Sequence, residues 1–383
     1  MNGSTGKKIT RRQAIGRTVA GVASAAVIAG VGGYLLGSSA AVSVTRTVTA
    51  PGGAQTIVET MTRTVTGTTT VTATPRLEPL TVRFTSTQGG RGTASNSLIA
   101  ENKRDISDRL ALSIQYNVVE GTGAAVKELV EGRADVIGPV TVAGLAGAME
   151  QNPDLKIFYF TDIGVYTTLL VGPNSPYNSL SDLRTAISQG RKIKIGYSRP
   201  GSLSHTYTVM LAHILGTRVG EGIEGVALGA TDAIIAAATR GEIDGFPWTP
   251  DVHWRLEEEG RGRIIYYFSE YFGSKWHELS FASTNTIIRN RPELIKRFVD
   301  YWREVTRYYL INRDEAIGLM TSQPPRGYGM SRNVAERYYS TYMPNYVGAP
   351  NRDALVNVDY FAKLSGVARN PPPPEQWYTS QFI

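Results

Sequence analysis

Hydrophobic positions from Leu80 onward alternate between two periods. Short β-branched runs predict strands, and stretches with apolar residues three or four apart predict helices. The predicted strands cover residues 81–86, 112–119, 134–138, 157–160, 166–171, 192–197, 226–228, 243–246, 264–268 and 279–288. The predicted helices cover residues 123–131, 179–189, 200–214, 232–240, 292–312, 331–342 and 353–364. This alternation predicts an α/β protein with mainly parallel sheets and helices on both faces of each sheet.

The first 77 residues differ from the rest in composition. Residues 7–17 carry five basic side chains, and residues 18–40 are uncharged and rich in small and apolar types. A basic stretch before an apolar one predicts an export signal or a transmembrane anchor over residues 1–40, and these two alternatives stay open. Thr10-Arg11-Arg12 resembles a twin-arginine export signal. Either alternative places the following chain outside the cytoplasm, at the cell surface or in a periplasm.

Residues 41–77 form a threonine-rich segment, with thirteen threonines between positions 41 and 75. The Thr-Val-Thr theme recurs at residues 47–49, 64–66 and 70–72. Such a composition cannot bury a core, and it predicts a stalk between the N-terminal segment and the body. A glycosylated stalk and a plain flexible linker are both consistent with it.

The charge and the cysteine content exclude several classes of function. The net charge is +7, but residues 1–40 hold five basic residues and no acid, which leaves 35 basic and 33 acidic residues elsewhere. A nearly balanced body gives no electrostatic reason to bind phosphate backbones, so we expect no nucleic-acid partner. The chain has no cysteine, which excludes disulfides, zinc–thiolate sites and cysteine nucleophiles.

Polar and glycine-rich loops follow the predicted strands where a ligand is expected. In open parallel sheets, ligands bind beyond the carboxyl ends of the strands, and a helix start there favours anionic or strongly polar groups. The candidate ligand-binding residues chosen on this basis are Thr87, Gln88, Gly89, Gly121, Thr122, Thr141, Ser198, Gly201, Ser202 and Trp248. Arg91 and Arg199 could neutralise an anion, but a role as ordinary surface side chains is favoured for both. Trp248 is expected either to stack on a ligand or to pack beneath the site.

Catalytic patterns are missing from the sequence. Gly196-Tyr197-Ser198-Arg199-Pro200 imitates a nucleophile elbow, but proline replaces the last glycine. His205 and His213 are eight residues apart, too far for a helical metal chelate with four-residue spacing. We therefore predict no catalytic residue, no metal site and no cofactor, and a protein that is not an enzyme.

Three stretches, taken in order, resemble the solute-binding proteins of ATP-driven importers, in the branch for nitrate, sulfonates, taurine and thiamine-type pyrimidines. They are residues 126–138 with the turn Gly132-Arg133-Ala134-Asp135, residues 177–202 with Pro200-Gly201-Ser202, and residues 289–298. Residues 230–245 repeat the helix and "G-x-x-D" turn of the first stretch. The glycine-rich loop at residues 87–92 leans toward the related receptors of ion-gradient-driven tripartite transporters, called the TAXI type.

The resemblance implies a two-lobed fold of the periplasmic-binding-protein type (type II), with the ligand between the lobes. Lobe I would comprise residues 78–171 and 283–383, and lobe II residues 172–282, joined by crossover strands at 166–171 and 281–288. The implied function is capture of a small polar or anionic solute, such as a sulfonate, nitrate or taurine, and its delivery to the membrane permease of an ABC importer. We expect a monomer. The alternatives are a TAXI-type receptor, a ligand-sensing ectodomain and, less favoured, an enzyme on the same scaffold.

Overall fold

The computed structural model describes residues 42–48, 57–63, 77–87, 96–342 and 348–383. Contacts divide the chain into two units, residues 1–75 and 76–383. In the first unit, β1 (Val42–Val48) and β2 (Ile57–Arg63) pair antiparallel. The segment predicted as a stalk thus contains a two-stranded ribbon that the flexible-linker interpretation missed. Alternating valine and threonine favour strands.

The predicted export signal or anchor, residues 1–40, lies outside the described residues. Within the described part of the chain, no helix is both long and apolar enough to cross a bilayer.

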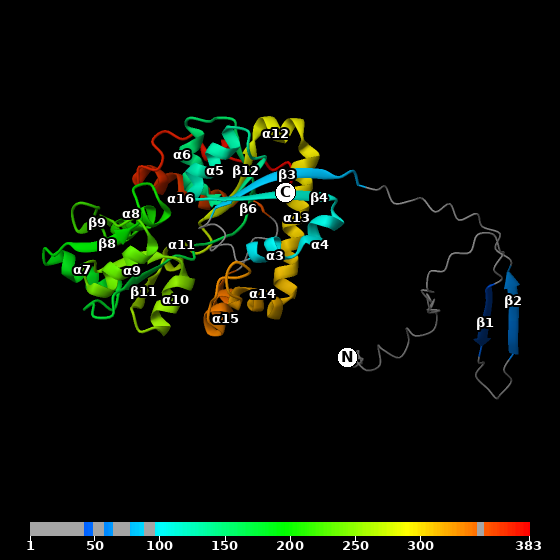
Figure 1. Ribbon diagram of the computed structural model, residues 1–383, viewed down its shortest axis with the longest axis horizontal. Coiled ribbons are helices and arrows are strands. Elements are labelled where there is room, and N and C mark those ends of the chain that lie inside the picture. Colours follow the sequence, from blue (N-terminus) through cyan, green and yellow to red (C-terminus); the bar gives the residue numbers. More distant parts are fainter. Residues whose placement is uncertain (1–41, 49–56, 64–76, 88–95, 343–347) are drawn as a thin grey trace, which may run out of the picture. The chain divides into compact units, whose positions relative to one another are not determined.

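The second unit contains two five-stranded sheets, which lie in two separate groups of elements in Figure 1. Their strand orders are β4-β3-β5-β12-β6 and β11-β7-β10-β8-β9. In each sheet three neighbouring strands pair parallel, and one strand, β12 or β7, runs antiparallel to both of its neighbours. The strands are β3 (Leu80–Thr87), β4 (Leu112–Val119), β5 (Val136–Thr141), β6 (Leu155–Phe160), β7 (Thr168–Val171), β8 (Ile193–Tyr197), β9 (Ile223–Ala227), β10 (Gly245–Trp248), β11 (Arg263–Tyr267) and β12 (Leu279–Thr284).

Helices cover both faces of each sheet. On the first sheet, α13 packs with α3, α4 and α14 on one face, and α5, α6 and α16 lie on the other; on the second sheet, α7 and α8 lie opposite α9 and α10. The helices are α3 (Ser97–Asn102), α4 (Arg104–Arg109), α5 (Gly121–Val130), α6 (Val142–Met149), α7 (Leu180–Ser188), α8 (Leu203–Ile214), α9 (Thr231–Arg240), α10 (Pro250–Glu258), α11 (Ser269–Phe272), α12 (Asn285–Asn290), α13 (Pro292–Ile311), α14 (Arg313–Thr321), α15 (Arg332–Thr341), α16 (Arg352–Leu364) and the 3-10 turn η2 (Pro374–Gln376). The predicted α/β class with two mainly parallel sheets is confirmed.

One predicted strand is wrong in its second half. Residues 279–288 were expected to be extended, but β12 ends at Thr284 and α12 begins at Asn285. The hydroxyl of Thr284 accepts the N–H of Ile287 and caps the new helix. Six further helices, α3, α4, α6, α10, α11 and α14, were not predicted from the sequence.

The chain passes twice between the sheets. The first crossing, residues 161–167, joins β6 to β7, and the second, residues 268–278, joins β11 to β12. The two strands expected as crossovers each follow one of these crossings, and each pairs within the sheet it enters. Strand pairing therefore changes from one sheet to the other a few residues before the predicted lobe boundaries, which lie between residues 171 and 172 and between residues 282 and 283. The hydrophobic core runs across the crossings, because Trp276 packs among Tyr207, Phe272 and Phe361.

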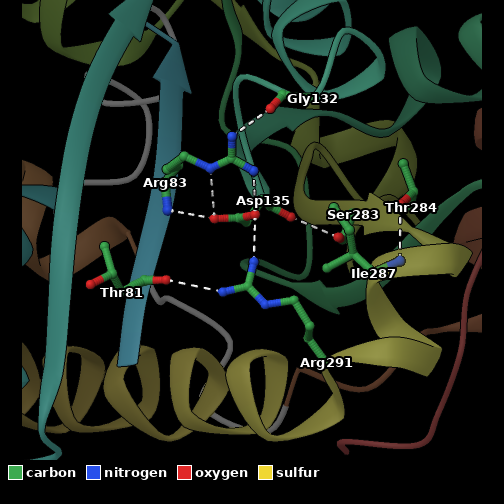
Figure 2. Close-up of polar contacts among 8 residues, drawn as sticks. All are labelled: Thr81, Arg83, Gly132, Asp135, Ser283, Thr284, Ile287 and Arg291. Carbon is green, nitrogen blue, oxygen red and sulfur yellow. Dashed lines mark hydrogen bonds and ion pairs between the residues drawn. The ribbon is translucent and has the colours of Figure 1, made fainter. Parts of the chain in front are cut away.

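Asp135, the aspartate of the first "G-x-x-D" turn, fixes the amino end of β5 to its neighbours (Figure 2). One carboxylate oxygen accepts the backbone N–H and the side-chain Nε of Arg83, at 2.9 and 3.1 Å. The other oxygen accepts Nη2 of Arg83 at 2.7 Å and Nη1 of Arg291 at 2.8 Å. Arg83 belongs to β3 and Arg291 precedes α13. A single carboxylate thus joins two strands and the longest described helix.

Asp244, in the second "G-x-x-D" turn, repeats this arrangement in the other sheet. Its carboxylate accepts the backbone N–H of Lys194 at 2.8 Å, and its own N–H donates to the carbonyl of Lys194 at 2.8 Å. Asp135 makes the same reciprocal pair with Arg83. The repeated "G-x-x-D" turn therefore corresponds to the same reciprocal pair of hydrogen bonds, which occurs at one such turn in each sheet.

Candidate functional site

The carboxyl ends of the first-sheet strands bring Thr87, Thr122 and Thr141 together. Thr87 is buried at the end of β3, and its hydroxyl donates to the carbonyl of Pro139 at 2.7 Å. The hydroxyls of Thr122 and Thr141 lie 3.0 Å apart, and Thr122 Oγ1 also accepts the N–H of Thr141. Thr141 caps α6 by accepting the N–H of Gly144. The hydroxyls of these predicted residues therefore hold the loops in place.

A cluster of serines occupies the corresponding edge of the second sheet. Ser202 caps α8 by accepting the N–H of His205 at 3.2 Å. Its hydroxyl lies 3.1 Å from that of Ser204, which is itself 3.2 Å from the hydroxyl of Ser198. Ser204 is buried and accepts the N–H of Ser198. Ser204 was not among the predicted residues, although its place two residues after the cap was a usable signal.

His205 stays neutral in this loop. Its Nδ1 accepts the N–H of Gly201 at 3.2 Å, so any proton on the neutral ring sits on Nε2. Burial lowers its pKa below the ordinary value. Gly201 is exposed and has a φ of 78°, a backbone conformation that favours glycine.

Trp248 ends β10 and is half-buried. Its ring packs on the apolar cluster beneath the sheet, with the Phe246 ring centroid 6.5 Å away. The next residue, Thr249, precedes α10, whose first residue is Pro250. This placement favours the packing role for Trp248 and leaves only part of its surface exposed.

The loops of the two lobes approach each other at Gly121 and Arg199. A Cβ built on Gly121 would lie 3.1 Å from Nη2 of Arg199, so the guanidinium from the second lobe reaches the first residue of α5 in the first lobe. Gly121 has a φ of 75°, which also favours glycine there. Arg199 is exposed, and no carboxylate of the described residues pairs with it.

The helices that start at this junction carry no acidic residue in their first turns. This holds for α5, α6 and α8, as it does for α3, α12 and α15, whereas the first turns of α7, α9 and α10 contain Asp182, Asp232 and Asp251. The positive end of a helix dipole is stabilised by a nearby negative charge. At the start of α5, beside Arg199, the nearest acid of the same helix is its N-cap residue, Glu120, which is exposed.

Some predicted residues and features lie elsewhere. Gln88 and Gly89, with Arg91, fall outside the described residues. Two hollows on the described surface, one beside α13 and one on α16, include none of the predicted site residues. No group of three histidine, aspartate or glutamate side chains in the described part of the chain is placed to hold a metal ion.

No protein-family model matches the sequence, and no curated protein matches it. Solved structures do match the fold. The periplasmic aliphatic sulphonate binding protein SsuA from Escherichia coli superposes with a TM-score of 0.66 and 16% identity, covering 79% of this chain and 92% of its own. The nitrate-binding protein NrtA from Synechocystis PCC 6803 gives a TM-score of 0.56 and 10% identity, covering 78% and 88%.

Two further matches widen the range of functions on this fold. A Candida albicans protein described as having the generic periplasmic binding protein fold gives a TM-score of 0.61 and 18% identity, covering 79% of this chain and 96% of its own. The desulfurization enzyme DszB gives a TM-score of 0.56 and 14% identity, covering 79% and 97%. With its two mixed sheets, two crossings and these matches, the chain has the periplasmic binding protein fold.

Proposed function

We propose that the chain is an extracytoplasmic solute-binding protein that captures a small anionic or zwitterionic solute between its two lobes. The observation that carries this proposal is the approach of Arg199 to the start of α5. A guanidinium from one lobe faces a helix N-terminus of the other, and both groups attract negative charge. A bound anion between them would stabilise both, and it would make contacts in the closed arrangement that an open one lacks.

Sulfonates and nitrate are the first candidates for the solute. Both are oxyanions, which helix N-termini and arginine bind through N–H donors. The sulphonate- and nitrate-binding proteins among the structural matches support this choice at the level of the fold. Taurine fits as well, because it carries a sulfonate beside an ammonium group.

The proposal is tested by thermal-shift screening of the protein with sulfonates, taurine, nitrate, bicarbonate, amino acids and pyrimidines. A ligand at 100 times its Kd stabilises the folded protein by about 2.7 kcal/mol. Arg199→Ala and Ser202→Ala should weaken the best ligand at least about tenfold, because each removes a donor or a cap from the facing loops. Arg240→Ala is the matched control, since Arg240 pairs with Glu242 at the far end of α9. Unchanged affinity in both site variants, or no oxyanion that binds, would refute the proposal.

The partner that fits this role is the permease of an ABC importer, to which the protein would deliver its solute. A TAXI-type receptor or a sensor ectodomain would use the same ligand site. Two observations distinguish the ABC-importer receptor, the TAXI-type receptor and the sensor ectodomain. They are the identity of the neighbouring genes and whether the protein stimulates ATP hydrolysis by a co-reconstituted permease. The N-terminal segment would export or anchor the protein, and the mature N-terminus, determined by sequencing, distinguishes cleavage from anchoring.

The match to DszB favours one second candidate, an enzyme on the same scaffold. His277 and His253 are fully buried and away from solvent, so neither is placed to act on a bound solute. A turnover assay on the best ligand decides between the two, since a receptor returns the ligand unchanged.

A further inference from the structure

Each crossing between the sheets carries one buried carboxyl group that the solute site does not use. Asp162 lies on the first crossing, and Glu278 is the last residue of the second. Their exposed fractions are 1% and 2%. Acids at this depth are rarely left without a function or a partner.

Hydrogen bonds join these two groups to both crossings and to the second lobe. Asp162 Oδ1 accepts the backbone N–H of Glu278 at 3.0 Å and of Leu279 at 3.3 Å. Glu278 accepts the hydroxyl of Tyr207 at 2.7 Å and that of Thr167 at 3.5 Å. Tyr207 belongs to α8, whose start carries Ser202 of the candidate site. Glu278 therefore links the second crossing to a helix that must move with the second lobe.

Among the described residues, no side chain around Asp162 and Glu278 supplies a positive charge to pair with their carboxyl groups. His277 is neutral, because its Nδ1 donates to the carbonyl of Asp162, its Nε2 accepts the N–H of Asn351, and burial lowers its pKa to about 4. The other titratable groups near the pair are hydroxyls, from Tyr166 on the first crossing, from Tyr207 on α8, and from Tyr338 and Tyr342 at the end of α15.

The electrostatic consequence is that the pair takes up a proton close to neutral pH. Burial raises the pKa of Glu278 to about 7, although hydrogen bonds from Tyr207 and Thr167 work against the rise. Burial, and then the charge of Glu278, raises the pKa of Asp162 well above its ordinary value. An ionised Glu278 would place an uncompensated charge in this part of the core.

We propose that the pair Asp162–Glu278 is a proton-sensitive hinge: Glu278 holds a proton while the lobes are packed as in this structure and releases it when lobe opening admits water. The proposal rests on the proposed two-lobed receptor, and it adds that protonation regulates its closure. Because the closed arrangement binds more protons than the open one, acid favours closure. The preference is greatest below the ordinary carboxyl pKa and is lost as the pH rises through about 7.

The experiment needs no ligand, so its outcome is independent of the solute assignment. The chain lacks cysteine, and spin labels can be placed at Lys127→Cys on α5 and Ala233→Cys on α9, both exposed. Pulsed dipolar spectroscopy of the full chain then gives the distance between the lobes. Between about pH 8.5 and about pH 5.5, the ratio of short to long distances should rise on the order of tenfold.

Two variants test the assignment to Glu278. Glu278→Gln cannot ionise, so the change of its distances between about pH 8.5 and about pH 5.5 should be smaller than in the parent. Glu242→Gln, an exposed glutamate, is the control and should respond like the parent. If Glu278→Gln fails to fold, Tyr207→Phe serves instead: loss of the hydroxyl that favours the ionised form should move the midpoint to higher pH. The proposal would be overturned if the distances between the spin labels do not change with pH, or if the pH response persists unchanged in Glu278→Gln or Tyr207→Phe.

Discussion

Asp135→Asn is the substitution whose effect the structure defines best. The carboxylate is 2% exposed and accepts four N–H donors from Arg83 and Arg291 (Figure 2). Asparagine keeps the size but has a single acceptor oxygen, so its amide N–H groups would face either Nη2 of Arg83 and Nη1 of Arg291, or the backbone N–H and Nε of Arg83. In either orientation two N–H donors would lose their acceptor.

The expected magnitude follows from the exposure of the partners. Removing one partner of a fully buried ion pair costs about 3–5 kcal/mol. Here the guanidinium side chains are 42% and 43% exposed, so water screens part of the interaction and about 2–3 kcal/mol is expected. Asp244→Asn is the matched comparison in the second sheet. Its carboxylate accepts from Lys194 N and from Arg191 only, so about 1–2 kcal/mol is expected.

Urea denaturation at neutral pH measures both variants, and acidification provides a second check. Burial acts to raise the pKa of Asp135, but hydrogen bonds from Arg83 and the charge of Arg291 outweigh it and hold the pKa below its ordinary value. Its stabilisation is therefore present above the ordinary carboxyl pKa and is lost as the pH falls below it. The difference between parent and Asp135→Asn should shrink toward about pH 3. A loss under about 1 kcal/mol at neutral pH, or a difference that acid leaves unchanged, contradicts this reasoning.

Three further substitutions test local features. Gly144→Ala places a Cβ 2.6 Å from the hydroxyl of Thr141, so it should displace that cap and weaken solute binding at least about tenfold, measured by titration calorimetry. Ser179→Ala removes the cap of α7 and should lower the unfolding free energy by about 1 kcal/mol in urea. Arg337→Ala removes a cation 4.4 Å from the Trp254 ring centroid, which should cost about 1 kcal/mol and loosen the α15–α10 contact, visible as a longer distance between the lobes.

Periodicity identified most of the strands because the sheets are buried on both faces. Residues 81–86 and 192–197 are β-branched or apolar at the positions that face the helices, and they became β3 and β8. The helix at residues 285–290 was missed because Thr286-Ile287-Ile288 is β-branched and suits either structure. The residue that marks the change from strand to helix is Thr284, which caps α12. Threonine is too common for this one residue to predict the end of a strand.

The structure brings three of the predicted site residues together, while their role in binding a ligand stays a prediction. Strand-end position brought Thr87, Thr122 and Thr141 to one edge, as parallel pairing requires. Sequence alone could not show that their hydroxyls hold the loops, because that depends on distances between segments far apart in the chain. Asp162 and Glu278 gave no signal for the same reason: neither lies in a motif, and their meaning comes from burial.

The two "G-x-x-D" contacts and the proposed binding residues lie at opposite ends of the strands. Asp135 and Asp244 each clamp a strand near its amino end with charged and backbone donors. At the carboxyl ends, helices without acids in their first turns meet Arg199 and leave the negative charge to come from elsewhere. Substitutions at the amino ends should therefore change the unfolding free energy with little effect on affinity, and substitutions at the carboxyl ends should do the reverse.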